Sequence, residues 1–383
     1  MISSRDRIME RTELIMTMLT KTGTTMVRSH RRRRDVVVTR ASRYSAGIVA
    51  TAAVVLSACA PPNAPAASPD SQDARTTPDK TFATTAQVLD AVKAAQSINV
   101  LPSSVAASLS AASTAEDQAK ATARFDCQQI APPANFVDFS KSESNHEFGQ
   151  CASGAEHGTK LMVVYGESRA PMWAAALEGV AAENGYKLRT FYMNGCPALD
   201  LHFTSYETHA PNDECYQFHQ SAIAAIQNLH PDLVITTSYS TQMLADGSQP
   251  TAAQWQEGWA STFHELAQPG TRFAMLGDIP TWEKDDAHCL AAHVRAVQEC
   301  SAPISEAKSE NLDAEKAAAD AAGALYIPTF PWVCADRCEP VIADIRVYQD
   351  RFHFSNSYAV YLTGAVGEAL QPALATATRQ GRR

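Results

Sequence analysis

Short apolar runs alternate with longer amphipathic segments along the chain from residue 160 onward. A short continuous apolar run is typical of a strand buried on both faces, whereas apolar residues that recur every three or four positions are typical of a helix with one buried face. Strands that alternate with helices in this way predict a three-layer α/β/α sandwich with a parallel sheet. The expected strands span residues 161–165, 188–193, 233–237, 272–276 and 324–327, and the expected helices span residues 171–183, 215–229, 252–266, 305–322 and 355–370.

The chain before the first expected strand lacks this alternation. Weak helical patterning from residue 82 to 123 predicts a helical lead-in, and the polar segment 126–158 predicts irregular structure stapled by its two cysteines. Residues 60–82 are rich in Ala, Pro, Ser, Thr and Asp, which predicts a disordered tether. We therefore expect one folded domain over residues 83–376 and a disordered tail over residues 377–383.

Residues 1–59 have the pattern of an export signal. A basic region ends at Arg43, an uncharged stretch rich in Ala, Val and Leu follows, and small residues precede Cys59. The apolar stretch is shorter than the ~20 residues that a membrane-spanning helix needs. Leu56-Ser57-Ala58-Cys59 resembles the bacterial lipobox, in which the cysteine is acylated and becomes the mature N-terminus; the alternative is a plain signal peptide with an incidental cysteine. Residues 1–25 resemble neither a signal nor a domain, which fits a translation start at Met26.

The distribution of charge argues against one class of function. The whole chain carries a formal charge of −9. Its first 58 residues hold eleven Lys and Arg and four acids, so 21 basic and 37 acidic residues remain, a formal charge of −16. A body this acidic repels a phosphate backbone, and we expect no binding to nucleic acid.

Cysteine use fits an exported protein independently of the signal. Eight cysteines follow Cys59, and an even number in an exported chain predicts four disulfides, although many pairings are open. Pairing between sequence neighbours closes short loops outside the expected strands. The alternative is a metal site with Cys334 and Cys338 as one half. No second closely spaced pair of Cys or His in the sequence completes it. The neighbour pairs are Cys127 with Cys151, Cys196 with Cys215, Cys289 with Cys300, and Cys334 with Cys338.

Two short motifs carry residues suited to nucleophilic catalysis. Ser168 follows the first expected strand directly, at the edge of the sheet where doubly wound folds bind ligands. Asp350 lies three residues before His353, so its carboxylate can hold the imidazole Nδ1 and leave Nε2 free to take a proton from a serine. Each motif alone is unspecific, because Ser168 can serve only as a helix N-cap and the Asp-His pair can form a solvated polar turn.

Two further motifs are Gly195-Cys196-Pro197, after the second expected strand, and the block from Pro331-Trp332 to Cys338. Together the motifs resemble the SGNH domain appended to acyltransferase-3 family membrane proteins, over about residues 82–370. The resemblance implies an SGNH-hydrolase-like, flavodoxin-like sandwich in which Ser168 is the nucleophile and Asp350 and His353 complete a triad, with no metal or organic cofactor. The matching motifs, in the family's order, are Gly166-Glu167-Ser168, Gly195-Cys196-Pro197, the block from Pro331-Trp332 to Cys338, and Val347-Tyr348-Gln349-Asp350-Arg351-Phe352-His353.

The family also implies where an oxyanion is held. Its members use the nucleophile N–H, a Gly after the second strand and an Asn after the third. Gly195, with Asn194 beside it, fits the second position, whereas the third loop offers the hydroxyl of Ser238 in place of an Asn. The family usually has Gly-Asp-Ser-His at the nucleophile, but Glu167 and Arg169 flank the serine here.

The resemblance implies a function in the cell envelope, because family members move or remove O-acyl groups, usually acetyl, on envelope glycans. We therefore expect a serine esterase or O-acyltransferase acting on an O-acylated glycan or glycolipid, exported and lipid-anchored on the outer face of the cytoplasmic membrane. This sequence has no multi-span acyltransferase region, so transfer would need a separate membrane protein as acyl donor. The alternative is a non-catalytic envelope lipoprotein that keeps the fold and binds glycan or a partner protein.

The order of basic region, apolar stretch and lipobox makes the anchor testable. We expect mass spectrometry of the mature protein to find a diacylglyceryl group on Cys59 as the first residue, and Cys59→Ala to abolish that modification. An intact N-terminus upstream of Cys59, or a soluble form cleaved elsewhere, would contradict the anchor.

Overall fold

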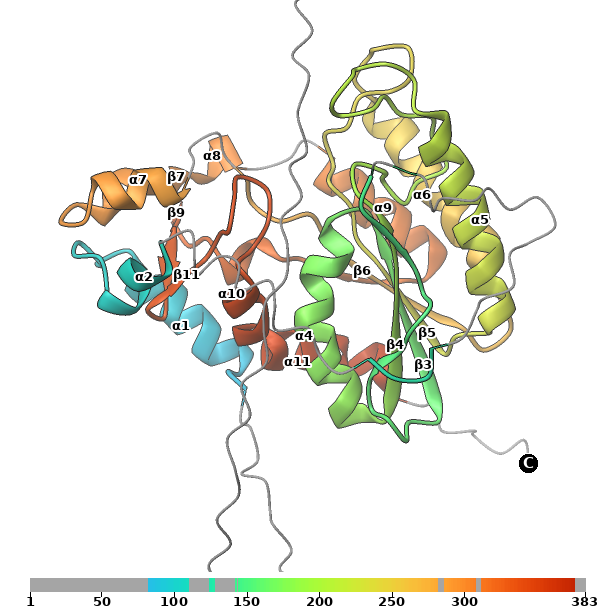
Figure 1. The fold of residues 1–383 in the computed structure, drawn as a ribbon, viewed down its shortest axis with the longest axis horizontal. Helices are drawn as coiled ribbons and strands as arrows, with labels where there is room; N and C mark the ends of the chain where they lie inside the picture. The colour runs from blue at the N-terminus through green and yellow to red at the C-terminus, as the bar shows by residue number, and fades with distance from the viewer. Residues whose placement is uncertain are drawn as a thin grey trace, which may run out of the picture. The chain divides into compact units, whose positions relative to one another are not determined.

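The fold is described from a computed structural model (Figure 1). Cys59, the signal region, the expected tether apart from Phe82, and the expected tail from residue 377 lie outside the residues that the structure describes. Within the described ranges, no helix combines the length and the apolar character needed to cross a membrane. The structure describes residues 82–109, 124–127, 142, 144–281, 286–307 and 311–375, all within one unit that spans Arg75–Arg383.

Parallel strands form the centre of the main sheet, as the apolar runs predict. Their order is β4-β3-β5-β6-β8, with each neighbouring pair parallel. Counted along the chain from β3, this is the order 2-1-3-4-5 of flavodoxin-like sheets. The strands are β3 (Lys160–Gly166), β4 (Tyr186–Met193), β5 (Leu233–Thr236), β6 (Arg272–Leu276) and β8 (Leu325–Ile327).

Two short antiparallel strands extend the sheet beyond β4, where the sequence predicts irregular structure. β1 (His146–Phe148) and β2 (Ser153–Gly154) both pair with β4, so the prediction for residues 126–158 is wrong at these positions. Strands this short show no period of two in the sequence, because a turn with a left-handed Gly149 separates them after only a few residues. They satisfy the backbone groups of β4 that would otherwise form an open edge.

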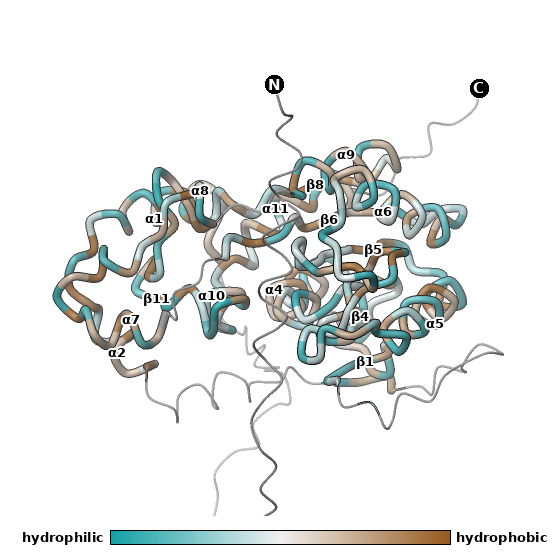
Figure 2. Tube along the Cα trace, turned by 90° about the horizontal axis from the view of Figure 1, so that it is seen from above, coloured by the Kyte–Doolittle hydropathy of each residue, from teal (hydrophilic) through white to brown (hydrophobic). Residues whose placement is uncertain are grey.

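Helices cover both faces of the sheet, which confirms the three-layer sandwich (Figure 1). Met162 and Val164 of β3 pack against one set of helices, while the alternate residues Val163 and Tyr165 pack against the other. Figure 2 shows hydrophobic residues along β5, between the two helical layers. The apolar cluster on the first face includes residues of α4 (Arg169–Asn184) and α11 (Thr363–Leu374), against which α1 (Thr85–Ala95) and α10 (Asn356–Tyr361) pack, and the cluster on the second face includes residues of α5 (Asp213–Leu229), α6 (Ala252–Leu266) and α9 (Leu312–Ala322).

Local signals explain where several helices begin and end. Gly185 and Gly323, both left-handed, end α4 and α9, and the hydroxyl of Ser355 caps α10 by accepting from Tyr358 N–H. The expected last helix is interrupted at Leu362 and continues to Leu374. The expected helix over residues 305–322 corresponds to α8 (Ile304–Ala307) and α9, with residues 308–310 outside the described ranges.

A smaller apolar cluster packs beside the sandwich. It joins α2 (Ser103–Ser108) to two later parts of the chain through Val105, Leu290, Val297 and Val341. The remaining elements are α2 (Ser103–Ser108), α7 (Asp286–Ala292), η3 (Val297–Cys300), β7 (Ala302–Pro303), η4 (Phe330–Trp332), β9 (Arg337–Cys338), β10 (Val341–Ile342) and β11 (Ile345–Arg346).

Four disulfides join the neighbour pairs that the sequence predicts. The Cα atoms are 4.0 Å apart for Cys127–Cys151, 5.3 Å for Cys196–Cys215, 5.7 Å for Cys289–Cys300 and 4.0 Å for Cys334–Cys338. His293 lies against the third bridge, with Nδ1 3.7 and 3.9 Å from the two sulfurs. Cys334 and Cys338 therefore bond each other, as do Cys289 and Cys300, instead of offering thiolates to a metal.

The Cys196–Cys215 bridge fixes the segment after β4 to α5, and its removal should be measurable. The double change Cys196→Ala and Cys215→Ala frees a loop of 19 residues, so we expect the free energy of unfolding to fall by ~2–4 kcal/mol in a denaturant titration. Peptide mapping without reductant should recover all four neighbour pairs. Different pairs, or an unchanged unfolding midpoint in the double variant, would contradict this account.

Candidate active site

The turn between β3 and α4 places Ser168 at the carboxyl edge of the sheet. The chain can pass close to the end of β5 because Gly166 has no side chain; a Cβ there would lie 2.5 Å from the Thr237 carbonyl oxygen. Ser168 occupies the N-cap position of α4, but its hydroxyl makes no capping hydrogen bond. The side chain is therefore used for something other than capping.

Ser168, His353 and Asp350 form one hydrogen-bonded chain although the serine and the histidine are 185 residues apart in sequence. His353 Nε2 lies 2.7 Å from Ser168 Oγ, and His353 Nδ1 lies 2.9 Å from each carboxylate oxygen of Asp350. Asp350 also accepts the N–H groups of Phe352 and His353, both at 2.8 Å, which closes the turn before α10. Ser168, His353 and Asp350, which the sequence analysis singled out, thus lie within hydrogen-bond distance of one another in that order.

The environment of Asp350 favours its ionised form. Burial alone would raise the pKa of its carboxyl, but the hydrogen bond and charge of His353, together with the two backbone N–H groups, outweigh burial and lower that pKa. An ionised carboxylate at Nδ1 keeps the imidazole in the tautomer whose Nε2 can face the serine.

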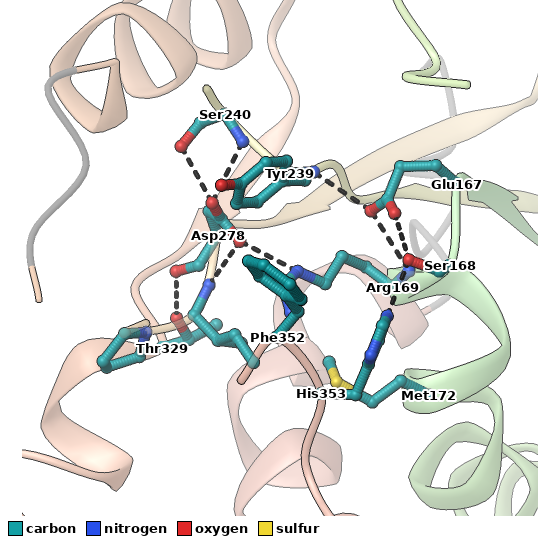
Figure 3. Close-up of polar contacts among 12 residues, drawn as sticks. Glu167, Ser168, Arg169, Met172, Tyr239, Ser240, Asp278, Thr329, Phe352 and His353 are labelled. Atoms are coloured by element: carbon teal, nitrogen blue, oxygen red, sulfur yellow. Dashed lines mark hydrogen bonds and ion pairs between the residues drawn. The ribbon is translucent and has the colours of Figure 1, made fainter. Parts of the chain in front are cut away.

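The Glu167 carboxylate contacts the Ser168 hydroxyl and the backbone of Arg169 and Tyr239 (Figure 3). The Glu167 side chain is 2% exposed. Oε1 accepts the N–H of Arg169 at 3.1 Å and the N–H of Tyr239 at 3.0 Å, while Oε2 lies 2.5 Å from Ser168 Oγ. One carboxylate thus contacts the start of α4, the loop after β5 and the hydroxyl of Ser168.

Arg169 turns into the protein, where it meets a carboxylate that the sequence analysis missed. Its Nε donates to Asp278 Oδ1 at 3.1 Å, and the two side chains are 1% and 2% exposed. Asp278 Oδ2 accepts the N–H and the hydroxyl of Ser240 at 3.0 and 2.8 Å (Figure 3). Asp278 lies two residues after the end of β6, as Ser168 lies two residues after the end of β3. A search for polar residues just after the expected strands could therefore have found it.

Two of the three oxyanion candidates line the cavity beside Ser168, and the third does not. Gly195, left-handed with φ 67°, lines a cavity beside Ser168 together with Asn194. Ser238 is buried, its hydroxyl has no hydrogen-bond partner among the described residues, and the structure does not bring it to this cavity. Tyr239 lines the cavity instead, with its N–H already donated to Glu167.

Two cavities meet at the serine and the histidine. One of about 390 Å³ is bordered by the aromatic side chains of Tyr206, Tyr239 and Phe352, and the other, of about 500 Å³, is bordered by Met172 and Tyr192; Ser168 and His353 line both. The Phe352 ring centroid lies 6.0 Å from that of Tyr206 and 5.7 Å from that of Tyr239. Sequence periodicity gave no signal for Tyr206 or Phe352, because both lie in irregular segments.

Solved structures of other proteins align with part of this chain. The periplasmic domain of a lipopolysaccharide acetyltransferase from Salmonella ser. Paratyphi A aligns over 56% of this chain and 85% of its own, with 15% identity and a TM-score of 0.44. A GDSL-like lipase from Bacteroides thetaiotaomicron aligns over 56% of this chain and 89% of its own, with 15% identity and a TM-score of 0.35. Comparison with curated proteins finds no match.

One family model covers most of the folded region described above. Residues 138–368, more than half of the chain, match the model of the SGNH domain that is fused to AT3 domains. The match includes the strands of the main sheet, the Ser168 turn and the segment that carries Asp350 and His353. The chain therefore belongs to the family of SGNH domains found fused to AT3 domains.

Proposed function

We propose that this protein is an extracytoplasmic serine esterase or O-acyltransferase that acts on O-acyl groups, acetyl above all, of envelope glycans or glycolipids. The observation that carries the proposal is the contact of 2.7 Å between Ser168 Oγ and His353 Nε2, with Asp350 2.9 Å from His353 Nδ1. Nucleophile, base and orienting carboxylate at hydrogen-bond distances are the arrangement that activates a serine.

The reaction follows from these contacts in two steps. Ser168 Oγ attacks the acyl carbonyl while His353 Nε2 takes the hydroxyl proton, and the N–H groups of Ser168 and Gly195 face the developing oxyanion. His353 then returns that proton to the oxygen of the leaving alcohol, and the acyl group remains as an ester on Ser168. A water molecule or a sugar hydroxyl, deprotonated by His353, takes the acyl group and restores the serine.

The surroundings of the serine support a carbohydrate as one partner. Two cavities that share Ser168 and His353 give room for an acyl group on one side and an alcohol on the other. Tyr206, 55% exposed, and Phe352 offer aromatic faces on which a sugar ring can pack. The four disulfides and the expected signal support a location outside the cytoplasm. The lipobox-like sequence supports a lipid anchor at Cys59, and acyl transfer would use a separate membrane protein as donor.

A non-catalytic protein that binds glycan or a partner through this fold is the second candidate. The contact between Glu167 and Ser168 Oγ favours it, because a serine that donates to a carboxylate is not donating to its base. A fluorophosphonate probe separates the two candidates: labelling of Ser168 supports the enzyme, and a folded protein that is never labelled supports the binding protein.

Replacing the nucleophile tests the enzyme most directly. We expect Ser168→Ala to abolish both fluorophosphonate labelling and turnover of an acetyl ester, because it removes the attacking oxygen and leaves the packing of α4 intact. The melting temperature should stay at the wild-type value, and Ser103→Ala, at an exposed position in α2, serves as the matched control. Full activity of Ser168→Ala on the acetyl ester would refute the nucleophile assignment.

Replacing the orienting carboxylate tests the histidine tautomer. Asp350→Asn should lower turnover by up to ~10⁴-fold, because an amide that donates to Nδ1 favours the tautomer with its proton on Nε2. Asp336→Asn makes the same chemical change at an exposed position and should leave turnover unaffected. Equal turnover in the two variants would remove Asp350 from the mechanism.

A further inference from the structure

Ser168 has two hydrogen-bond partners for one hydroxyl. Its Oγ lies 2.7 Å from His353 Nε2 and 2.5 Å from Glu167 Oε2. A serine hydroxyl donates one hydrogen and accepts others, whereas an ionised carboxylate and a neutral imidazole nitrogen without a proton only accept. Serine can therefore donate to one of the two partners, and the other must bring a proton of its own.

With Asp350 ionised, as its lowered pKa favours, counting protons over the chain from Asp350 to Glu167 gives two arrangements that satisfy both contacts. If Ser168 donates to Glu167, His353 must carry a proton on Nε2 as well as the one that Nδ1 donates to Asp350. If Ser168 donates to His353, Glu167 must be protonated and donate to Oγ. Either arrangement holds one proton more than a serine, a neutral histidine and two ionised carboxylates. In the first arrangement Nε2 is already occupied and cannot act as a base.

Glu167 cannot easily leave this position. Its other oxygen accepts the N–H groups of Arg169 and Tyr239, and the side chain is 2% exposed, so a rotamer change would leave two backbone donors unpaired. The guanidinium of Arg169 does not draw the Glu167 carboxylate away from Ser168, because it pairs with Asp278 through Nε. The contact with Ser168 is thus built into the fold.

The ionisable groups around the serine come from several elements. The Glu315 carboxyl on α9, next to Asp278, has its pKa raised well above the ordinary value by burial, so it adds little negative charge. The charges of Arg169 and Asp278 offset each other. One carboxylate then remains at each end of the Ser168–His353 pair, Glu167 at the serine and Asp350 at the histidine. The groups are Glu167 and Arg169 at the start of α4, Tyr206 and Glu207 before α5, Tyr239 after β5, Asp278 after β6, Glu315 on α9, and Asp350 and His353 before α10.

We propose that Glu167 is a positioning residue that competes with His353 for the Ser168 proton, so that in the resting site Ser168 donates to Glu167 and His353 Nε2 carries an additional proton. The proposal rests on the proposed hydrolytic or transferase function. Activity requires that this proton leave, which it does from His353 Nε2 to water in the adjoining cavity, and that the serine hydroxyl then donate to Nε2. A second carboxylate stabilises the protonated state, so the acid limb of the pH–rate profile lies at a higher pH than in a site without Glu167.

Glu167→Gln tests the proposal with little change in shape. The backbone N–H groups of Arg169 and Tyr239 hold the amide oxygen, which turns the amide nitrogen toward Ser168 Oγ as a donor. The serine proton then goes to His353, and no additional proton is needed. We expect the acid limb of the pH dependence of fluorophosphonate labelling, and of kcat/KM on an acetyl ester, to move down by about one pH unit or more, the size expected for losing a charge at this distance.

The controls separate charge from structure. Glu183→Gln removes the same charge at an exposed position near the end of α4 and should leave the acid limb where the wild type has it. Glu167→Asp keeps the charge but is too short for all three contacts, so its acid limb should lie between those of the wild type and Glu167→Gln. This second variant also serves if thermal melting shows that the first does not fold.

The outcomes are distinguishable from failure of the proposed function. Wild-type protein that no pH renders reactive to the fluorophosphonate would refute the enzymatic function itself. If the wild type is labelled and its acid limb lies at the same pH as those of Glu167→Asp and Glu167→Gln, the proposed role of Glu167 is overturned. The proposed function then still stands. A limb that moves to lower pH in both variants supports the proposal.

Discussion

The buried pair of Arg169 and Asp278 is the interaction on which the geometry of the site depends. It joins the first residue of α4 to the end of β6, and Asp278 in turn accepts from Ser240 in the loop after β5. A buried ion pair contributes little net stability, but removing one partner leaves an uncompensated charge and costs about 3–5 kcal/mol. The pair therefore does less to stabilise the fold than to select one arrangement of three loops.

Glu167 complements this pair from the other side of the turn. Its carboxylate takes the N–H of Arg169 and that of Tyr239, so the start of α4 and the loop after β5 share one acceptor. The tie to Tyr239 crosses between two loops that pass close to each other at Gly166. Because the strands are parallel and in register, their carboxyl ends meet at one edge, and short polar side chains from successive loops can reach each other there.

Features that depend on buried apolar runs, on cysteine spacing or on short motifs could be predicted from the sequence. The parallel strands, the helix over residues 252–266 and the cysteine pairs follow from such signals, and Ser168, Asp350 and His353 follow from motif order. β1 and β2 were missed because their pairing is decided by β4 and not by their own residues. Asp278 and the aromatic side chains of the cavity were missed because their roles arise from loop packing, which no periodicity records. The anchor at Cys59 stays a prediction, since that residue lies outside the described ranges.

The first turn of α4 shows how the sequence leaves one donor for chemistry. A helix start has N–H groups without partners in the helix, and here Glu167 takes two of them, Arg169 N–H through its side chain and Ala170 N–H through its carbonyl. Pro171 has no N–H to offer. Among the described residues, the Ser168 N–H then has no acceptor, and it lies beside the hydroxyl that would attack a carbonyl. Glu167 thus satisfies the two amides that follow the serine, and the Ser168 amide stays available as one of the donors that an oxyanion on that carbonyl would need.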